Sequence, residues 1–84
     1  MANVKMFRVV CTYKGFSIEM DEKLFSAAKK ALNKRHGYSD GSGCGLGERD
    51  HEWNDLNLLQ ATTLVTALSA ISPLLDVYYD DEEN

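Results

Sequence analysis

The sequence predicts a small α+β protein, a two-layer sandwich in which two helices cover one face of a three-stranded antiparallel sheet. Three observations lead to this class. Residues 4–14 and 16–20 alternate apolar and polar side chains with the period of two that is typical of strands. Residues 21–36 and 55–71 place apolar residues at helical spacing. A final alternating run at 74–79 completes the expected order of strand, strand, helix, helix, strand.

The first two strands are expected to form a β-hairpin. The first strand places one set of apolar side chains on a common face: Phe7, Val9, Cys11 and Tyr13. Gly15 provides the tight turn after Lys14, and the alternation then resumes with Phe16, Ile18 and Met20 inward. The strand at 74–79 is expected to pair beside the first strand, because the hairpin occupies its other edge.

The first helix is the most clearly marked element. Asp21 is the expected N-cap, and Gly37 is expected to stop the helix. Its apolar stripe is rich in alanine, which predicts close packing against the sheet. Four cations gather toward its C-terminal end, where they complement the helix dipole: Lys29, Lys30, Lys34 and Arg35.

Residues 38–53 are predicted to be a glycine-rich loop, because glycines recur at 41, 43, 45 and 47 with no periodic apolar pattern. The second helix is expected to begin at Asp55 or Asn54 and to end before Pro73. We therefore expect one domain over residues 1–79, followed by an acidic tail at 80–84.

The hairpin that leads straight into an alanine-rich helix resembles the plan of many small phage and mobile-element accessory proteins, which include anti-restriction and anti-CRISPR inhibitors. The similarity covers residues 4–36 and rests on architecture, without a diagnostic motif. It implies an inhibitor of a host nucleic-acid-handling system, and it assigns no functional residue.

Composition narrows the class further. The chain has 84 residues, and no apolar run approaches the ~18 residues of a membrane span. The N-terminus lacks the apolar stretch of a signal peptide, and the two cysteines are fewer than small secreted domains usually carry. These features predict a cytoplasmic protein that does not bind membranes.

Charge is divided unevenly along the chain. Residues 1–37 carry eight Lys or Arg against three Asp or Glu, whereas residues 38–84 carry one Arg against ten acids. A basic half and an acidic half indicate a polar binding surface, an internal neutralisation, or both.

The residue types that carry chemistry do not form a recognisable catalytic or metal-binding motif. The glycine-rich stretch lacks the Lys-Ser/Thr of a phosphate-binding loop, because Glu48 follows Gly47. His36, Cys44 and His51 lack the short paired spacings of zinc ligands. Cys44 with a histidine has the residue types of a nucleophilic pair, but an acidic glycine-rich loop would not lower the pKa of a thiol. We therefore predict no enzyme activity, no metal and no cofactor.

The leading functional hypothesis is a non-enzymatic protein that binds another protein with a basic surface. Acidic clusters with aromatic residues can occupy a basic groove on a partner. The loop at 38–53 is expected to contribute to the contact surface. The named contact residues lie at the C-terminus and at the end of this loop: Trp53, Tyr78, Tyr79, Asp80, Asp81, Glu82 and Glu83. A core position covering the sheet edge is the alternative for Trp53, and a solubilising terminus is the alternative for the tail.

Nucleic-acid binding is the alternative function. The basic helix 21–36 would contact phosphates through Lys29, Lys30, Lys34 and Arg35. The overall net charge of −4 and the pI near 5.0 weigh against this alternative. A homodimer is a further hypothesis, because the strand at 74–79 could be an exposed edge and the oppositely charged halves could pair.

Overall fold

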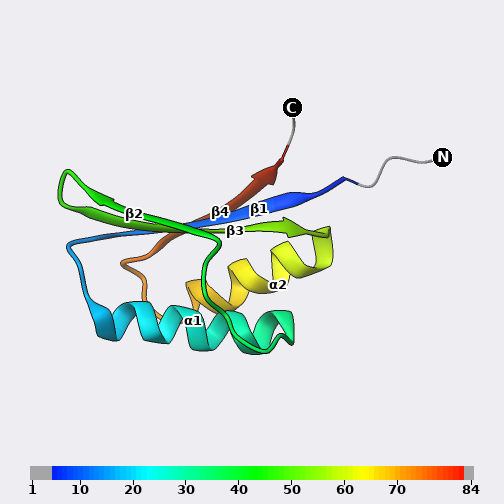
Figure 1. The fold of residues 1–84 in the computed structure, drawn as a ribbon, viewed down its shortest axis with the longest axis horizontal. Helices are drawn as coiled ribbons and strands as arrows, with labels where there is room; N and C mark the ends of the chain where they lie inside the picture. The colour runs from blue at the N-terminus through cyan, green and yellow to red at the C-terminus, as the bar shows by residue number, and fades with distance from the viewer. Residues whose placement is uncertain (1–4, 83–84) are drawn as a thin grey trace.

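A computed structural model describes residues 5–82, which form two helices and a four-stranded antiparallel sheet. The elements are β1 (Phe7–Lys14), α1 (Ile18–Leu32), β2 (Gly41–Gly45), β3 (Glu48–Leu56), α2 (Leu58–Ser69) and β4 (Asp76–Asp81). Both helices lie on the same side of the sheet (Figure 1). The predicted α+β class is therefore confirmed, whereas the predicted three-stranded sheet and its ββααβ order are wrong.

The strands are arranged in the order β2-β3-β1-β4, with every neighbouring pair antiparallel. β1 is central and pairs with β3 on one side and with β4 on the other. This βαββαβ connectivity is the split βαβ, ferredoxin-like arrangement. The expectation that the last strand pairs beside the first is confirmed, but the other neighbour of β1 is β3 and not residues 16–20.

Residues 16–20 do not form the predicted second strand of a hairpin. Ser17 is the N-cap of α1, and its hydroxyl accepts a hydrogen bond of 3.1 Å from the Met20 amide. The helix therefore begins at Ile18, four residues before the start implied by an Asp21 cap. Phe16 and Ile18, expected to point inward, are instead exposed. α1 ends at Leu32, and the left-handed backbone of its C-cap Asn33 (φ 53°) stops the helix before Gly37.

The segment predicted to be a loop at 38–53 contains a β-hairpin made of β2 and most of β3. Leu46 and Gly47 form its turn, with φ angles of 53° and 80°, the positive pair of a tight hairpin turn. β3 alternates as a strand should, but two of its inward side chains are Arg49 and His51. Because these residues are polar, the alternation gave no apolar signal.

Residues 57–82 follow the prediction with shifted boundaries. α2 begins after Asn57, where Asn57 and Gln60 form a reciprocal capping box. β4 extends through Asp81, and the Glu82 amide donates a hydrogen bond of 3.0 Å to the Met6 carbonyl. The first residues of the expected 80–84 tail therefore belong to the sheet, whereas Glu83 lies outside the described residues.

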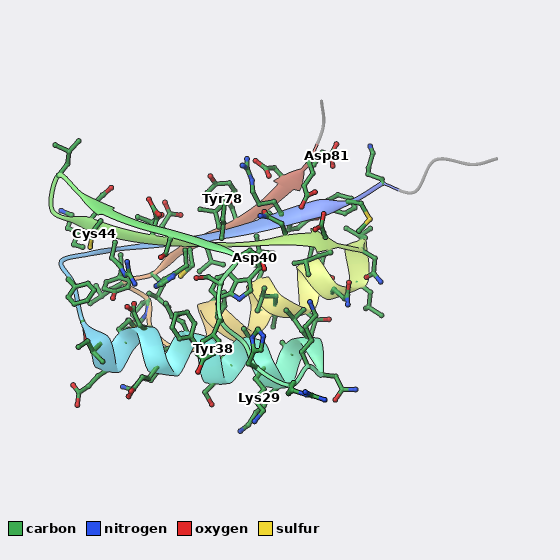
Figure 2. The ribbon with its side chains drawn as sticks, viewed as in Figure 1. Lys29, Tyr38, Asp40, Cys44, Tyr78 and Asp81 are labelled. Carbon is green, nitrogen blue, oxygen red and sulfur yellow. The ribbon has the colours of Figure 1, made fainter. Side chains whose placement is uncertain are left out.

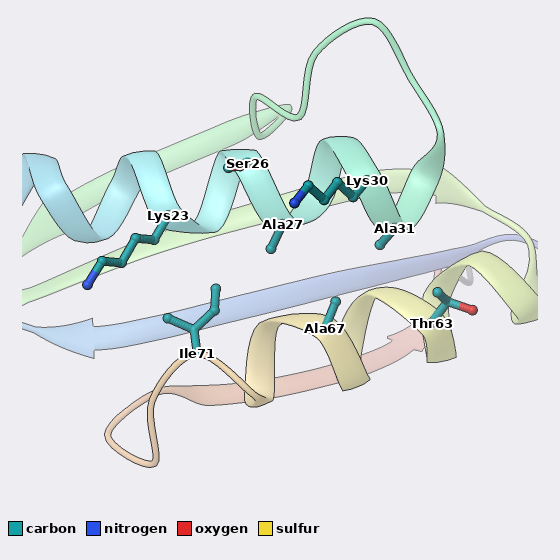
Figure 3. Close-up of a pocket in the computed structure, with 8 residues that line it drawn as sticks. All are labelled: Lys23, Ser26, Ala27, Lys30, Ala31, Thr63, Ala67 and Ile71. Atoms are coloured by element: carbon teal, nitrogen blue, oxygen red, sulfur yellow. The ribbon is translucent and has the colours of Figure 1, made fainter.

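The core lies between the sheet and the two helices. Val9, Cys11, Leu24, Leu64 and Leu68 are fully buried there. Small side chains let the helices approach each other, and they line a groove of about 560 Å³ between α1 and α2 (Figure 3): Ser26, Ala27, Ala31, Thr63 and Ala67. Neither helix is long and apolar enough to cross a membrane, within the part of the chain that the structure describes.

Candidate functional site

One side of the sheet is left uncovered, because both helices pack on the other side (Figure 1). In β1 the buried residues alternate with partly exposed ones, so Val10 and Thr12 point away from the helices. Residues paired directly across neighbouring strands point to the same face of the sheet. The residues of β3 and β4 that pair with the outward residues of β1 therefore also lie on the uncovered face. We call this set the open face: Arg8, Val10, Thr12 and Lys14 of β1, Glu48, Asp50 and Glu52 of β3, and Asp76, Tyr78 and Asp80 of β4.

The open face is acidic, with five carboxylates against two cations. One cation is already paired, because the Arg8 guanidinium donates two hydrogen bonds to Asp80, from Nε at 3.1 Å and from Nη2 at 3.0 Å. This contact raises the pKa of Arg8 above its ordinary value. Among the described residues, Lys14 is the remaining cation on a surface of four further carboxylates, so the net charge there is negative.

Apolar atoms lie at the centre of the open face. Val10 pairs with Glu52 on one side and with Tyr78 on the other. The Tyr78 side chain is 46% exposed and lies on the side of the sheet away from the helices (Figure 2). The next row repeats the pattern, with Thr12 between Asp50 and Asp76. An aromatic ring flanked by carboxylates is an arrangement suited to contact with a basic protein surface.

The glycines of β2 have no side chains, and this leaves space for the acidic side chains of β3. Gly41 pairs with Glu52, and Gly43 pairs with Asp50. A Cβ at Gly41 would lie 3.2 Å from Glu52 Cγ, and one at Gly43 would lie 3.2 Å from Asp50 Oδ1. The two acidic side chains therefore lie against a strand that has no side chains on this face. The regular glycine spacing is thus a feature of the sheet edge.

An apolar end adjoins the open face. Three connections lie toward one end of the sheet, namely β1–α1, β2–β3 and α2–β4 (Figure 1). Each exposes a large apolar side chain, and Phe16 is 59%, Leu46 104% and Leu74 82% exposed. Phe16 and Leu74 line a hollow of about 620 Å³ together with Lys14. A second hollow joins Phe16 to Glu48. We call Phe16, Leu46 and Leu74 the apolar end.

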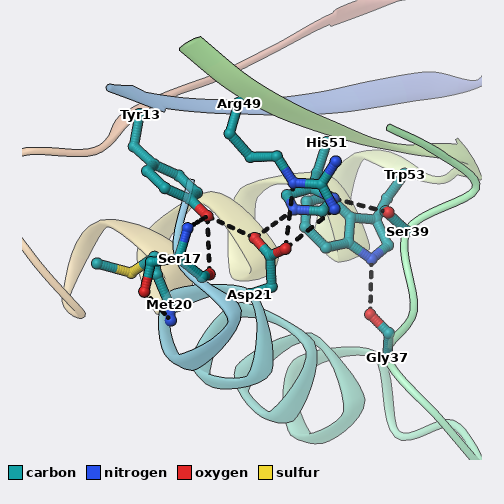
Figure 4. A network of polar contacts seen from close by, with 9 residues as sticks. All are labelled: Tyr13, Ser17, Met20, Asp21, Gly37, Ser39, Arg49, His51 and Trp53. Atoms are coloured by element: carbon teal, nitrogen blue, oxygen red, sulfur yellow. Dashed lines mark hydrogen bonds and ion pairs between the residues drawn. The ribbon is translucent and has the colours of Figure 1, made fainter. Parts of the chain in front are cut away.

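A buried polar network joins the sheet to α1 (Figure 4). The Asp21 carboxylate is its centre: Oδ1 accepts from Tyr13 Oη at 2.7 Å and lies 2.8 Å from His51 Nε2. Oδ2 accepts from Arg49 Nε at 3.1 Å and from Nη2 at 3.0 Å. Ser39 Oγ lies 2.9 Å from the other ring nitrogen of His51. The network therefore connects β1, α1, β3 and the segment before β2.

Burial of Asp21 by itself would raise the pKa of its carboxyl group. Hydrogen bonds from His51, Tyr13 and Arg49 outweigh that effect and hold the pKa below its ordinary value. Tyr13 responds in the opposite direction, because burial and its hydrogen bond to Asp21 raise the pKa of the phenol. Asp21 is thus a buried carboxylate that stays ionised, with a donor on each oxygen.

Ser39, His51 and Asp21 are the residue types of a hydrolase triad, but their surroundings favour a structural role. Asp21 also accepts hydrogen bonds from Arg49 and Tyr13, whereas the aspartate of a triad serves mainly to orient its histidine. His51 is 1% exposed and its ring lies beside Phe25 and Trp53, so a substrate cannot reach it. We therefore interpret the network as a set of structural contacts that hold α1 against the sheet.

The residues considered as metal ligands lie apart. His51 is buried with contacts on both ring nitrogens, whereas Cys44 is exposed on β2. The Nδ1 atom of His36 accepts a hydrogen bond from the Tyr38 amide. Within residues 5–82 no group of three or more His, Cys, Asp or Glu is arranged to hold a metal ion.

Strand alternation divides the aromatic and acidic residues that were expected to form one contact surface. Tyr78 and Asp80 lie on the open face, whereas Tyr79 lies on the helix side, with its ring 5.8 Å from that of Phe7. Asp81 pairs with Lys5 at 3.4 Å. The Glu82 carboxylate accepts a hydrogen bond from the Asp55 amide, at a position where β3 has a bulge.

Trp53 is not an exposed anchor. It is 2% exposed, and its indole Nε1 donates a hydrogen bond of 3.0 Å to the Gly37 carbonyl. The hydrogen bond satisfies the one polar group of the ring, so the side chain is accommodated in the core. Trp53 is therefore removed from the contact surface.

The sequence hypothesis included the 38–53 loop in the contact surface but did not single out Glu48, Asp50 and Glu52, because no strand was predicted there. The sequence signal for this strand was the alternation of acidic residues with Arg49 and His51 from Glu48 to Glu52. In the partner strand, glycine occupies every second position. Comparison with protein-family models, with curated proteins and with solved structures found no match to this chain.

Proposed function

We propose that this protein acts by binding another protein that presents a basic surface, and that it does so through the open face without catalysis. The observation that carries the proposal is the excess of carboxylates on a sheet face that no helix covers. Charge of one sign on a flat surface steers an oppositely charged partner and makes association fast and sensitive to salt.

The apolar end is expected to supply binding affinity that the charges of the open face alone would not. Interfaces derive most of their affinity from a few buried aromatic or aliphatic anchors, and charges at the rim contribute mainly to rate and specificity. Phe16, Leu46 and Leu74 are exposed side chains of this kind next to the acidic face. Phe16 and Leu74 line one hollow, and exposed apolar groups that adjoin in this way are typical of interaction sites.

Basic surfaces of the required kind occur on proteins that handle nucleic acids. A bound acidic face would compete there with the phosphate backbone, so inhibition of such a protein is the specific form of the proposal. The architectural resemblance to phage and mobile-element inhibitors does not support it, because the hairpin on which the resemblance rests is not present. Support comes from the charge and the exposed anchors.

Affinity capture with matched variants tests the proposal. The wild-type chain, E52Q/D76N and E19Q/E22Q are immobilised and exposed to extract of the source cells. Both double variants remove two negative charges, but Glu19 and Glu22 lie on α1, away from the open face. We expect a basic protein to be retained by the wild type and by E19Q/E22Q and lost from E52Q/D76N. Equal retention by all three would refute the proposal.

A further inference from the structure

A second surface lies at the C-terminal end of α1, on the side of the molecule opposite the open face. A hollow of about 320 Å³ is lined there by Phe25, Lys29, Arg35, His36 and Tyr38, together with Ser26 and Gly37. Lys29 and Tyr38 lie at the helix layer, whereas Tyr78 lies beyond the sheet (Figure 2). The lining contains two permanent cations and no carboxylate.

The Tyr38 ring is held in place although it is 63% exposed. It stacks on the His36 ring, with 4.9 Å between centroids and 26° between planes. It also meets Phe25 edge to face at 5.5 Å. Phe25 in turn contacts the buried His51 ring at 5.1 Å. A chain of aromatic contacts therefore runs from the core to the exposed ring and limits its motion.

The backbone beneath the ring is fixed as well. Gly37 is buried so tightly that a Cβ there would lie 1.9 Å from the Phe25 carbonyl oxygen. The Gly37 carbonyl accepts the hydrogen bond from Trp53, and the Tyr38 amide donates to His36 Nδ1 at 3.3 Å. The core thus determines where Tyr38 is displayed. An exposed aromatic ring that is preorganised in this way loses little conformational entropy when a ligand binds.

The structure separates the four cations that the sequence placed together. Lys29 and Arg35 line this hollow, whereas Lys30 lines the groove between the helices. Among the ion pairs of residues 5–82, none includes Lys29 or Arg35. Among the described residues, no carboxylate lines this hollow, and the acidic side chains of the open face lie on the other face of the sheet.

We propose that this hollow binds single-stranded nucleic acid, with one base stacked against Tyr38 and neighbouring phosphates contacting Lys29 and Arg35. Sequence-tolerant binding of single strands combines a positively charged groove with aromatic platforms on which bases stack. An acidic peptide would use the cations but would have no use for a fixed aromatic ring. Paired bases in a duplex are stacked on one another and cannot reach the ring.

Fluorescence anisotropy tests the proposal with the full chain and a labelled oligothymidylate of about ten nucleotides. The variants are Y38A, Y38F, K29Q/R35Q and the charge-matched control K5Q/K23Q, whose lysines lie outside the hollow. We expect binding at low salt that weakens as salt rises. We expect Y38A to reduce affinity about tenfold and Y38F to retain it. K29Q/R35Q should lose more affinity than K5Q/K23Q.

The ligand class is decided by competition with polyglutamate and with a duplex of the same length. Single-stranded competitor should displace the label at lower concentration than either alternative. Stronger displacement by polyglutamate, or an affinity that Y38A leaves unchanged, would overturn the proposal and leave only nonspecific attraction of polyanions. Absence of binding at low salt would overturn it directly. E52Q/D76N should bind as the wild type does, so this result is independent of the open face.

Discussion

His51 on β3 and Asp21 on α1 are joined by a contact of 2.8 Å between Nε2 and Oδ1, and both side chains are buried. The contact links the central part of the sheet to the first turns of the helix. Arg49 and Tyr13 complete the coordination of the same carboxylate. A chain of 84 residues has a small hydrophobic core. We therefore expect the hydrogen-bond network around Asp21 to contribute a large part of the free energy of unfolding.

Replacement of Asp21 by asparagine should destabilise the protein by about 3 kcal/mol, because it removes the negative charge from a buried group of polar partners. Arg49 would be left without its counter-ion, and His51 would face an amide. Urea unfolding followed by circular dichroism measures the loss. E22Q is the control, since it removes the same charge from the neighbouring exposed position. A D21N variant as stable as E22Q would show that the network does not hold α1 against the sheet.

Acid should weaken the wild-type protein through the same carboxylate. The pKa of Asp21 is lower in the folded state than its ordinary value of 3.8. Its stabilising contribution is therefore fully present above the unfolded pKa and is lost as pH falls through the folded one. We expect the unfolding free energy of the wild type to fall more steeply below about pH 4 than that of D21N. Parallel pH profiles would contradict this assignment.

The two cysteines should differ sharply in reactivity. Burial is the main cause that raises the pKa of Cys11 to about 12, whereas Cys44 is exposed on β2. Thiol reagents attack the thiolate, so Cys11 is protected both by access and by protonation. Titration with a chromogenic disulfide near pH 8 should modify Cys44 alone in the native protein and both cysteines in denaturant. Rapid native modification of Cys11 would show that the core opens readily.

Removal of the apolar anchors should weaken partner binding and leave the fold unchanged. Leu46 and Leu74 are exposed at the apolar end, so replacement of both by serine opens no cavity. We expect affinity for the captured partner to fall about tenfold or more, as for apolar anchors that become buried at an interface. L59S is the control, because Leu59 is also exposed but lies at the start of α2, toward the other end of the sheet. A loss as large in L59S would indicate nonspecific apolar contact.

The two-layer arrangement of helices and sheet could be predicted from the sequence, but the number of strands could not. Helical spacing and the alternation of β1 correctly predicted two helices on a sheet. The pairing of β4 with β1 is also observed, although it was inferred from an N-terminal hairpin that does not form. Phe16, Ile18 and Met20 led to the wrong prediction of a second strand, because apolar alternation over so short a segment also occurs at the start of a helix. The capping hydroxyl of Ser17 decided that conflict. β3 was hidden because the network requires Arg49 and His51 at inward positions.

For the candidate site, the negative charge could be predicted from the sequence, as could two surface residues, Tyr78 and Asp80, which lie on the open face. Acidity of the second half of the chain was evident, but alternation in β4 sends Tyr78 and Asp80 to one face and Tyr79 to the other. The open face is completed by Asp50 and Glu52, which neighbour β4 residues only through the intervening β1. Such a surface depends on strand order, which local sequence patterns do not determine.

A map of the partner's footprint by amide nuclear magnetic resonance tests directly whether the partner binds through the open face. The captured partner is titrated into isotope-labelled protein, and the changes in amide signals are assigned along the chain. We expect the largest changes at Val10, Thr12, Glu52 and Tyr78, with further changes at the apolar end around Leu46 and Leu74. Changes confined to the helix layer, with the amides of β1 and β4 unaffected, would contradict binding through the open face.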